Sequence, residues 1–254
     1  MPVPTTVSSL SIVIPAHNEE AALPETLATL RTAIDRIGKR PVEVVVVDNA
    51  SDDQTSEIAA GWGAVVVHEP AQSIARARNR GASESNGDFL VFIDADLQMP
   101  AHLLTRIVSE MEDPACWGGG CEIRYQPSSR ILQSYLWFWR VLGRVMHAVQ
   151  GSAQFITKDA FAAVGGYDES LWMGEDVDFF WRMRRAAKQA GGSVLELRDA
   201  GVVGSSRRFD TWPVHRVLFY TNPLVIWLLQ HRRAAWSGWY EDPPRTDESP
   251  GRGA

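Results

Sequence analysis

The sequence has little cysteine, and what it has lies in one short stretch. Its 254 residues include only Cys116 and Cys121. Residues 115–124 are expected to be extended, so strand alternation would point these two side chains to opposite faces. We therefore expect no disulfide between them, and two thiols alone do not make a structural zinc site. This cysteine usage favours a reducing compartment, the cytoplasm.

The sequence also lacks an excess of basic charge and any long hydrophobic run. Its 25 Lys and Arg residues stand against 31 Asp and Glu, for a net charge of −6, which argues against a partner that is nucleic acid. Residues 1–9 carry no basic segment followed by an apolar run, so we expect no signal peptide. The apolar stretch Val217 to Leu229 is broken at Pro223 and is shorter than the roughly 20 residues that span a bilayer. These absences leave peripheral contact at the inner face of a membrane as an open alternative to a purely cytoplasmic location.

Short apolar runs alternate with helical patterns through the first 100 residues. This order predicts βαβ units, and right-handed crossovers then build a mostly parallel sheet flanked by helices, a Rossmann-like α/β fold. Ligands of such sheets bind at the carboxyl ends of the strands. We expect strands at 10–15, 42–47, 64–67 and 88–93, with helices between them at 23–34, 54–60 and 74–83. Later in the chain we expect strands at 115–124, 154–157 and 194–197, and helices at 100–111, 131–149 and 175–189.

Two aspartates close the fourth expected strand. Asp94 and Asp96 are two residues apart, and paired carboxylates are natural ligands for a hard divalent cation such as Mg²⁺ or Mn²⁺. About one such pair is expected by chance in a chain of this composition, and Asp176 with Asp178 forms another. The alternative interpretation is an aspartate that stabilises a turn. The position at a strand's carboxyl end favours the metal role.

Other candidate residues have an ordinary structural interpretation beside the functional one. Asp48 ends the second strand, where it either stabilises a turn or accepts hydrogen bonds from a nucleobase. Glu175 and Asp176 open a helix, where acidic side chains are favoured by the helix dipole, but either could act as a general base. Arg78 and Arg208 belong to basic stretches that are either solvated or turned toward a phosphate.

Several common catalytic motifs are absent. We find no phosphate-binding loop ending in Gly-Lys-Ser/Thr, no His-Glu-x-x-His and no Gly-x-Ser-x-Gly. Gly61-x-Gly63 is followed by Val66 where a dinucleotide fingerprint needs Gly or Ala, and it precedes a strand instead of a helix. A Rossmann dehydrogenase is therefore disfavoured.

Six short motifs in order resemble the family 2 glycosyltransferases with the GT-A fold. The resemblance covers about Ser11 to Phe209, and each motif alone is weak. The position of Gln98 directly after the aspartate pair resembles the pattern of the polyprenyl-phosphate sugar transferases of this family. The motifs are Ile14-Pro15-Ala16-His17-Asn18-Glu19, Val47-Asp48-Asn49-Ala50-Ser51-Asp52, Ala75-Arg76-Ala77-Arg78-Asn79-Arg80-Gly81, Asp94-Ala95-Asp96-Leu97-Gln98, Gly165-Gly166-Tyr167-Asp168-Glu169 and Gly174-Glu175-Asp176-Val177-Asp178.

The resemblance implies an inverting enzyme that moves a sugar from a UDP- or GDP-linked donor to an acceptor hydroxyl or phosphate, with Mg²⁺ or Mn²⁺. Asp176 would be the base, and Glu175 would orient the substrate. Asp96 and Asp94 would bind the metal, with Gln98 and His215 as further candidate ligands. The residues implied to bind the nucleotide-sugar are Pro15, Ala16, Glu19, Asp48, Arg78, Asp94, Ala95, Asp96 and Arg208.

The resemblance also suggests how the chain is divided. Residues 10–209 would form the glycosyltransferase domain, with a nucleotide-binding half at about 10–98 and an acceptor half at about 99–209. Residues 210–240 would add an aromatic-rich helical extension on the acceptor side. Residues 241–254 contain three prolines and no periodicity, so we expect a disordered tail there.

Two other functions remain open. A sugar nucleotidyltransferase of the same fold would carry a Gly-rich basic loop after the first strand, where this chain has Ala16 to Glu19. A non-catalytic module that only binds nucleotide-sugars would not need Asp94, Asp96 and Asp176, so the presence of these residues argues against it. The acceptor is a saccharide, a lipid carrier or a small molecule. The aromatic residues at 135–139 and 212–239 indicate core packing, a homodimer contact or a helix at a lipid interface.

Overall fold

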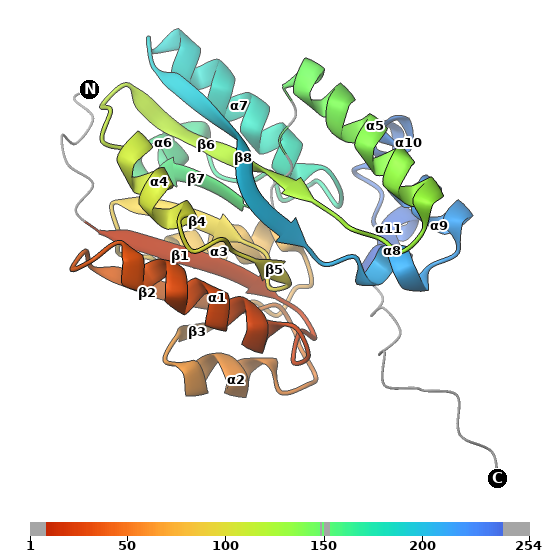
Figure 1. The fold of residues 1–254 in the computed structure, drawn as a ribbon, viewed down its shortest axis with the longest axis horizontal. Helices are drawn as coiled ribbons and strands as arrows, with labels where there is room; N and C mark the ends of the chain where they lie inside the picture. Colours follow the sequence, from red (N-terminus) through yellow and green to blue (C-terminus); the bar gives the residue numbers. More distant parts are fainter. Residues whose placement is uncertain (1–8, 148, 150–152, 241–254) are drawn as a thin grey trace.

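The computed structural model describes residues 9–147, 149 and 153–240, and the tail expected at 241–254 lies outside them. The described strands form one eight-stranded sheet in the order β3-β2-β1-β4-β7-β6-β8-β5, with helices on both faces (Figure 1). The strands are β1 Leu10–Ala16, β2 Val42–Asp48, β3 Val65–His68, β4 Phe89–Ile93, β5 Leu97–Gln98, β6 Cys116–Arg124, β7 Ala153–Thr157 and β8 Ser193–Gly204. The helices are α1 Leu23–Arg36, α2 Thr55–Trp62, α3 Ile74–Glu84, α4 Leu103–Glu110, α5 Arg130–Met146, α6 Lys158–Val164, α7 Glu175–Gln189, α8 Arg207–Thr211, α9 Val214–Tyr220, α10 Pro223–Leu229 and α11 Arg233–Tyr240.

The first half of the chain forms the predicted βαβ units. β1 pairs in parallel with β2 and with β4, and β2 pairs in parallel with β3. Neighbouring valines of β2 point to opposite faces of the sheet: Val46 packs with α1 and α4, whereas Val45 packs with α3 and α7. The run of valines is therefore a strand buried on both sides, as expected for a parallel sheet covered by helices. The α/β fold with a mostly parallel sheet is confirmed.

Each antiparallel pair includes β7 or β8, which come late in the chain. β7 runs antiparallel to both β4 and β6, and β5 pairs antiparallel with β8, while β6 and β8 are parallel. β8 is longer than predicted, extending to Gly204, and α6 was not predicted. Since β8 continues past residue 197, it carries the chain from the sheet to the basic segment at Arg207.

The expectation that the two cysteines face opposite sides of the sheet was wrong. Cys116 and Cys121 are both buried in the hydrophobic cluster on the α1 and α4 face. The pairing of β6 with β8 shifts register between Cys116 and Gly118, and a bulge of this kind interrupts side-chain alternation. Both thiols are free, so the expected absence of a disulfide stands.

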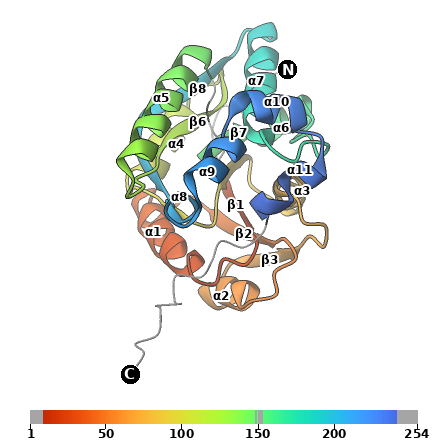
Figure 2. The ribbon, with the colours of Figure 1, turned by 90° about the vertical axis from the view of Figure 1, so that its right-hand side faces the viewer.

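Residues 207–240 fold as four short helices that meet α5 at one end of the molecule (Figure 2). Asn222 caps α10, its side-chain oxygen accepting from the backbone N–H groups of Leu224 and Val225, and Pro223 occupies the first helical turn. The Tyr135 and Thr221 hydroxyls lie 3.0 Å apart and tie α5 to the end of α9. Among the described residues, we find no helix long and apolar enough to cross a membrane.

Candidate active site

A cavity of about 1400 Å³ extends from the carboxyl end of β4 to the helices at the end of the molecule. Its polar end is lined by Asp94, Asp96, Glu175, Asp176 and Arg208, and its other walls come mainly from α5, from the segment that leads into α7 and from β6 and β8, with a smaller part from α10. Most of the predicted site residues with charged side chains therefore meet in one place.

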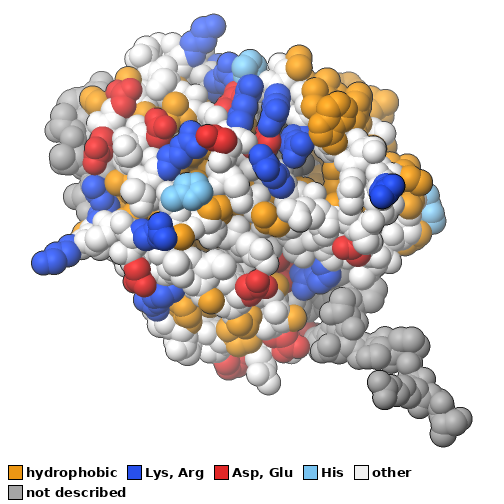
Figure 3. All heavy atoms as spheres, viewed as in Figure 1, with side chains coloured by type: hydrophobic (Ala, Val, Ile, Leu, Met, Phe, Trp, Pro, Cys, Tyr) orange, Lys and Arg blue, Asp and Glu red, His pale blue; other side chains and the backbone are white. Residues whose placement is uncertain are grey.

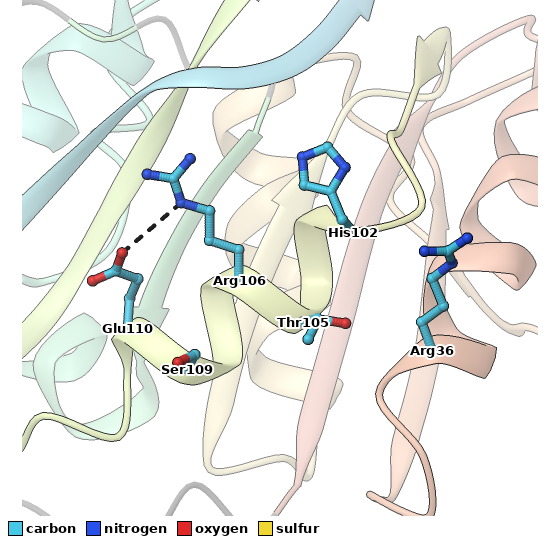
Figure 4. A pocket seen from close by; sticks show the side chains of 6 residues that line it. All are labelled: Arg36, His102, Thr105, Arg106, Ser109 and Glu110. Carbon is cyan, nitrogen blue, oxygen red and sulfur yellow. Dashed lines mark ion pairs between the residues drawn. The ribbon is translucent and has the colours of Figure 1, made fainter.

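A second, smaller hollow of about 540 Å³ lies over α4 (Figure 4). It is lined by Arg36 and by residues of α4 and the turn before it, among them Arg106 and Glu110, whose charged groups are 3.9 Å apart. None of the predicted site residues lines it. The larger cavity is therefore the candidate active site.

The aspartate pair lies directly after β4, and Ala95 between them anchors the segment. Ala95 is buried, and its carbonyl accepts a 2.7 Å hydrogen bond from the Thr26 hydroxyl. The flanking Asp94 and Asp96 side chains both line the cavity and are each 30% exposed. Burial, together with the nearby charges of Glu19 and Asp94, raises the pKa of Asp96 to about 7. The nearby Arg208 and Arg207 lower this pKa but do not offset the burial and the two carboxylates.

Two arginines after β8 face these carboxylates. Arg207 donates from one nitrogen to both carboxylate oxygens of Glu19, at 3.0 and 2.8 Å, and lies 4.0 Å from Asp96. Arg208 lies over the ring of Trp239 at 4.6 Å, and burial lowers the pKa of its guanidinium. Its Nε is buried without a hydrogen-bond partner in the described structure. Such an unsatisfied donor beside carboxylates fits a site built for an anionic ligand that brings its own cation.

Arg78 is turned inward from α3, but its partners are protein carboxylates. Its side chain is 3% exposed, and it donates to Glu175 at 2.8 Å and to Asp94 at 2.9 Å. Arg78 also lines the cavity, so its contact with a phosphate or ribose stays a prediction, made by a guanidinium whose Nη1 and Nη2 already donate to two carboxylates. The Arg78 side chain joins the end of β4 to the start of α7.

The candidate base is held in place by its backbone. α7 begins at Glu175, after Gly174 adopts a left-handed conformation with φ +78° that suits glycine. The Gln154 amide donates to the backbone carbonyl of Asp176 at 2.9 Å, and the Tyr167 hydroxyl donates to Gln154 at 2.8 Å. Asp176 lines the cavity. Tyr167 and Gln154 were not predicted as site residues; Tyr167 belongs to one of the six motifs, whereas nothing in the sequence marks Gln154.

Glu175 differs from its neighbour in being buried. Its carboxylate accepts from Arg78, and burial together with the charge of Asp176 raises its pKa to about 7. A buried glutamate tied to an arginine is well placed to fix the first turn of α7. Asp176, the more exposed of the two, is the better candidate to meet a substrate.

Pro15, Ala16 and Asp48 lie side by side at the carboxyl ends of β1 and β2, because Pro15 pairs with Val47 and Ala16 with Asp48. Asp48 has the structural role considered above. One of its oxygens accepts from the backbone N–H of Ser51 at 2.9 Å, and the other lies 3.2 Å from His68. A nucleobase there would share an oxygen that already accepts hydrogen bonds.

Two candidate metal ligands do not join the cluster. Gln98 is exposed, and its amide donates to Glu25 at 2.8 Å. His215 is exposed on α9 and does not line the cavity. Within the described ranges, no three His, Cys, Asp or Glu side chains are grouped as a metal site. A cation held here would therefore be bound by Asp94 and Asp96 together with oxygens of its ligand, which is how Mg²⁺ is commonly held.

This architecture is that of the GT-A glycosyltransferases. The mannosyltransferase PcManGT from Pyrobaculum calidifontis, solved in complex with GDP-Man and Mn²⁺, matches 93% of this chain and 66% of its own, with a TM-score of 0.61 and 21% identity. The glucosyl-3-phosphoglycerate synthase from Mycobacterium tuberculosis, solved with Mn²⁺, UDP and glucosyl-3-phosphoglycerate, matches 88% of this chain and 79% of its own, with a TM-score of 0.59 and 18% identity. At these identities the likeness establishes the fold.

The sequence comparison identifies the family. The model of glycosyl transferase family 2 matches residues 11–162, and the chain belongs to this family. It is 26% identical over 237 residues to the glycosyltransferase AglE of Haloferax volcanii, covering 89% of this chain and 76% of the relative. It is 34% identical over 115 residues to the undecaprenyl-phosphate 4-deoxy-4-formamido-L-arabinose transferase of Pseudomonas paraeruginosa, where the match spans 41% of this chain and one third of the relative. The protein is a glycosyltransferase, as the motifs indicated.

Proposed function

We propose that this protein transfers a sugar from a UDP- or GDP-linked donor to an acceptor hydroxyl or phosphate, by a single displacement that inverts the anomeric centre. The observation that carries the proposal is one cavity with two sets of carboxylates. Asp94 and Asp96 lie at the end of β4, and Asp176 lies at the start of α7. A direct displacement needs charge neutralisation at the departing diphosphate and a proton acceptor for the incoming group.

The donor end is assigned to the end of β4 and the loop after β8. Asp96 and Asp94 would hold Mg²⁺ or Mn²⁺, and a bound divalent cation neutralises negative charge on a diphosphate. Arg207 and Arg208 add fixed donors on the same side. The Glu19–Arg207 pair supports this assignment, because it places a guanidinium 4.0 Å from Asp96. Pro15, Ala16 and Asp48 would line the base and ribose.

The acceptor end is assigned to the start of α7. Asp176 would take the proton of the attacking hydroxyl. Glu175, fixed by Arg78, would hold the first turn of α7 close to the end of β4. Two similar proteins support the substrate classes: the sequence relative from Pseudomonas paraeruginosa is named for a lipid phosphate, and the structural neighbour PcManGT was solved with GDP-Man. Cytoplasmic location stays a prediction from the cysteine content.

Calorimetric titration of UDP and GDP, with and without Mn²⁺, tests the donor assignment. We expect one of the two nucleotides to bind only when Mn²⁺ is present, and Asp96→Asn to lose most of that binding. The control is Asp199→Asn, which removes an exposed carboxylate that pairs with Arg106 and does not line the cavity. Mn²⁺-dependent hydrolysis of the matching nucleotide-sugar separates a transferase from a binding module. Metal-independent binding, or release of pyrophosphate from a sugar phosphate and a nucleoside triphosphate, would contradict the proposal.

A further inference from the structure

The helix α5 exposes an apolar stripe to solvent. Within its seventeen residues only Leu132 is buried. Ile131, Phe138 and Val145 recur every seven residues and so share one face, and they are 71%, 53% and 73% exposed. A helix of a water-soluble monomer normally buries such a stripe. In the described structure this face of α5 is instead exposed to solvent.

A second apolar surface lies at the same end of the molecule. On α10, Leu224, Trp227 and Leu228 are 63%, 67% and 59% exposed. α5, α9 and α10 face the same side of the molecule (Figure 2). Figure 3 shows hydrophobic side chains gathered at this end, beside a group of Lys and Arg side chains. We call the exposed apolar residues of α5 and α10 the apolar end face.

The segments that build the apolar end face contain basic side chains and no acidic ones. Residues 123–157 and 211–240 include no Asp or Glu, although the whole chain has a net charge of −6. Four arginines of α5, α7 and β8 share two glutamates. Arg140 and Arg144 share Glu122, and Arg184 and Arg198 share Glu196. Apolar and aromatic side chains bordered by arginines are the composition of helices that lie in the headgroup region of an anionic bilayer.

We propose that the apolar end face docks on an anionic lipid bilayer, with α5 and α10 lying in the interface. Charge favours this occupant over a second copy of the chain, because a two-fold dimer through this face would bring like-charged arginines together. Trp137 and Trp227 belong to the apolar end face and also line the active-site cavity. Docking would therefore bring the cavity next to the lipid. A lipid-borne acceptor could then reach the cavity directly, a consequence that rests on the glycosyl transfer proposed above.

Flotation of the full chain with vesicles tests this inference. Vesicles of phosphatidylglycerol and phosphatidylcholine are compared with vesicles of phosphatidylcholine alone, without nucleotide or metal. The test variant is Val145→Glu with Leu228→Glu, since both side chains are exposed and neither lines the cavity. The control is Val65→Glu, which places the same charge on an exposed valine of the edge strand β3. Thermal melting of each variant checks folding.

We expect the wild-type chain to float with the anionic vesicles, and to float more weakly in high salt. The double variant should bind these vesicles with an affinity at least roughly tenfold lower, because it loses two apolar contacts and its added glutamates are repelled by the anionic surface. The Val65→Glu control should float like the wild type. Brominated lipid should quench part of the tryptophan fluorescence of the wild-type chain, and less of it after Trp137→Phe and Trp227→Phe. A wild-type chain that stays in the soluble fraction would overturn the inference, as would a concentration-dependent dimer that only the double variant loses. Neither result would touch glycosyl transfer to a soluble acceptor, because no step of this assay uses it.

Discussion

Arg78 donates to Glu175 across 97 positions of sequence, with Nη1 and Oε1 2.8 Å apart in a buried setting. The same guanidinium also donates to Asp94. The contact thus joins the helix that holds the candidate base to the strand end that holds the candidate metal ligands.

Replacing Arg78 with Met should lower the free energy of unfolding by about 3–5 kcal/mol, because it leaves a buried carboxylate without its counter-charge. Arg80→Met is the matched control on the same helix. Arg80 is 48% exposed and pairs with Glu84 one turn away, so its loss should change stability by at most about 0.5 kcal/mol. Urea unfolding followed by circular dichroism measures both. Equal midpoints for the two variants would show that the buried link is not structural.

A glycine in α3 should be irreplaceable, whereas one in α2 should not. A β-carbon on Gly81 would overlap the Val13 side chain and lie 2.8 Å from Val47, but one on Gly61 would meet nothing within 4 Å. Gly81→Ala should therefore cost about 1–3 kcal/mol through overpacking against the sheet. Gly61→Ala should raise stability by about 0.5–1 kcal/mol, because alanine favours helix. Thermal melting of the pair tests the close approach of α3 to the sheet, and a stabilised Gly81→Ala would contradict it.

Both cysteines should resist thiol reagents until the protein unfolds. Burial raises the pKa of the Cys116 thiol to about 11 and that of Cys121 to about 12. The thiolate is the reactive form, so at pH 8 to 9 both remain protonated in the folded state, while unfolded thiols are partly ionised. A chromogenic disulfide reagent should report close to zero reactive thiols in buffer and two in denaturant. One fast-reacting thiol in the native protein at pH 8 would contradict the buried placement of β6.

The sequence predicted the parts of the fold that depend on local pattern. The valines at 42–47 indicated a buried strand, and the periodic leucines after residue 22 indicated α1. Strand ends rich in aspartate then indicated the sheet edge where a site would form. These inferences succeed because apolar periodicity and the carboxyl ends of parallel strands are fixed by backbone geometry.

The contacts that could not be predicted join residues distant in sequence. Nothing in the sequence near Arg78 shows that it will meet Glu175, since the pairing depends on how α3 and α7 pack on one face of the sheet. The alternation argument failed at Cys116 because a register shift leaves no trace in the sequence. His215 was considered as a metal ligand because of the family resemblance, and the path of the chain after β8 places it on an exposed face of α9.

In the proposed reaction, Asp176 accepts the proton of the attacking group during sugar transfer. The most direct test of this role is the rate of Mn²⁺-dependent turnover of the bound nucleotide-sugar by Asp176→Asn, measured with the affinity for the nucleotide. The control is Asp178→Asn, because Asp178 lies in the same helical turn and its carboxylate accepts a 2.7 Å hydrogen bond from Arg182. The account predicts that Asp176→Asn loses ~10²–10⁴-fold in turnover with unchanged nucleotide affinity, while Asp178→Asn loses far less. Near-normal turnover by Asp176→Asn with only a slightly lower melting temperature would contradict the account and leave Asp176 as a helix-terminal charge.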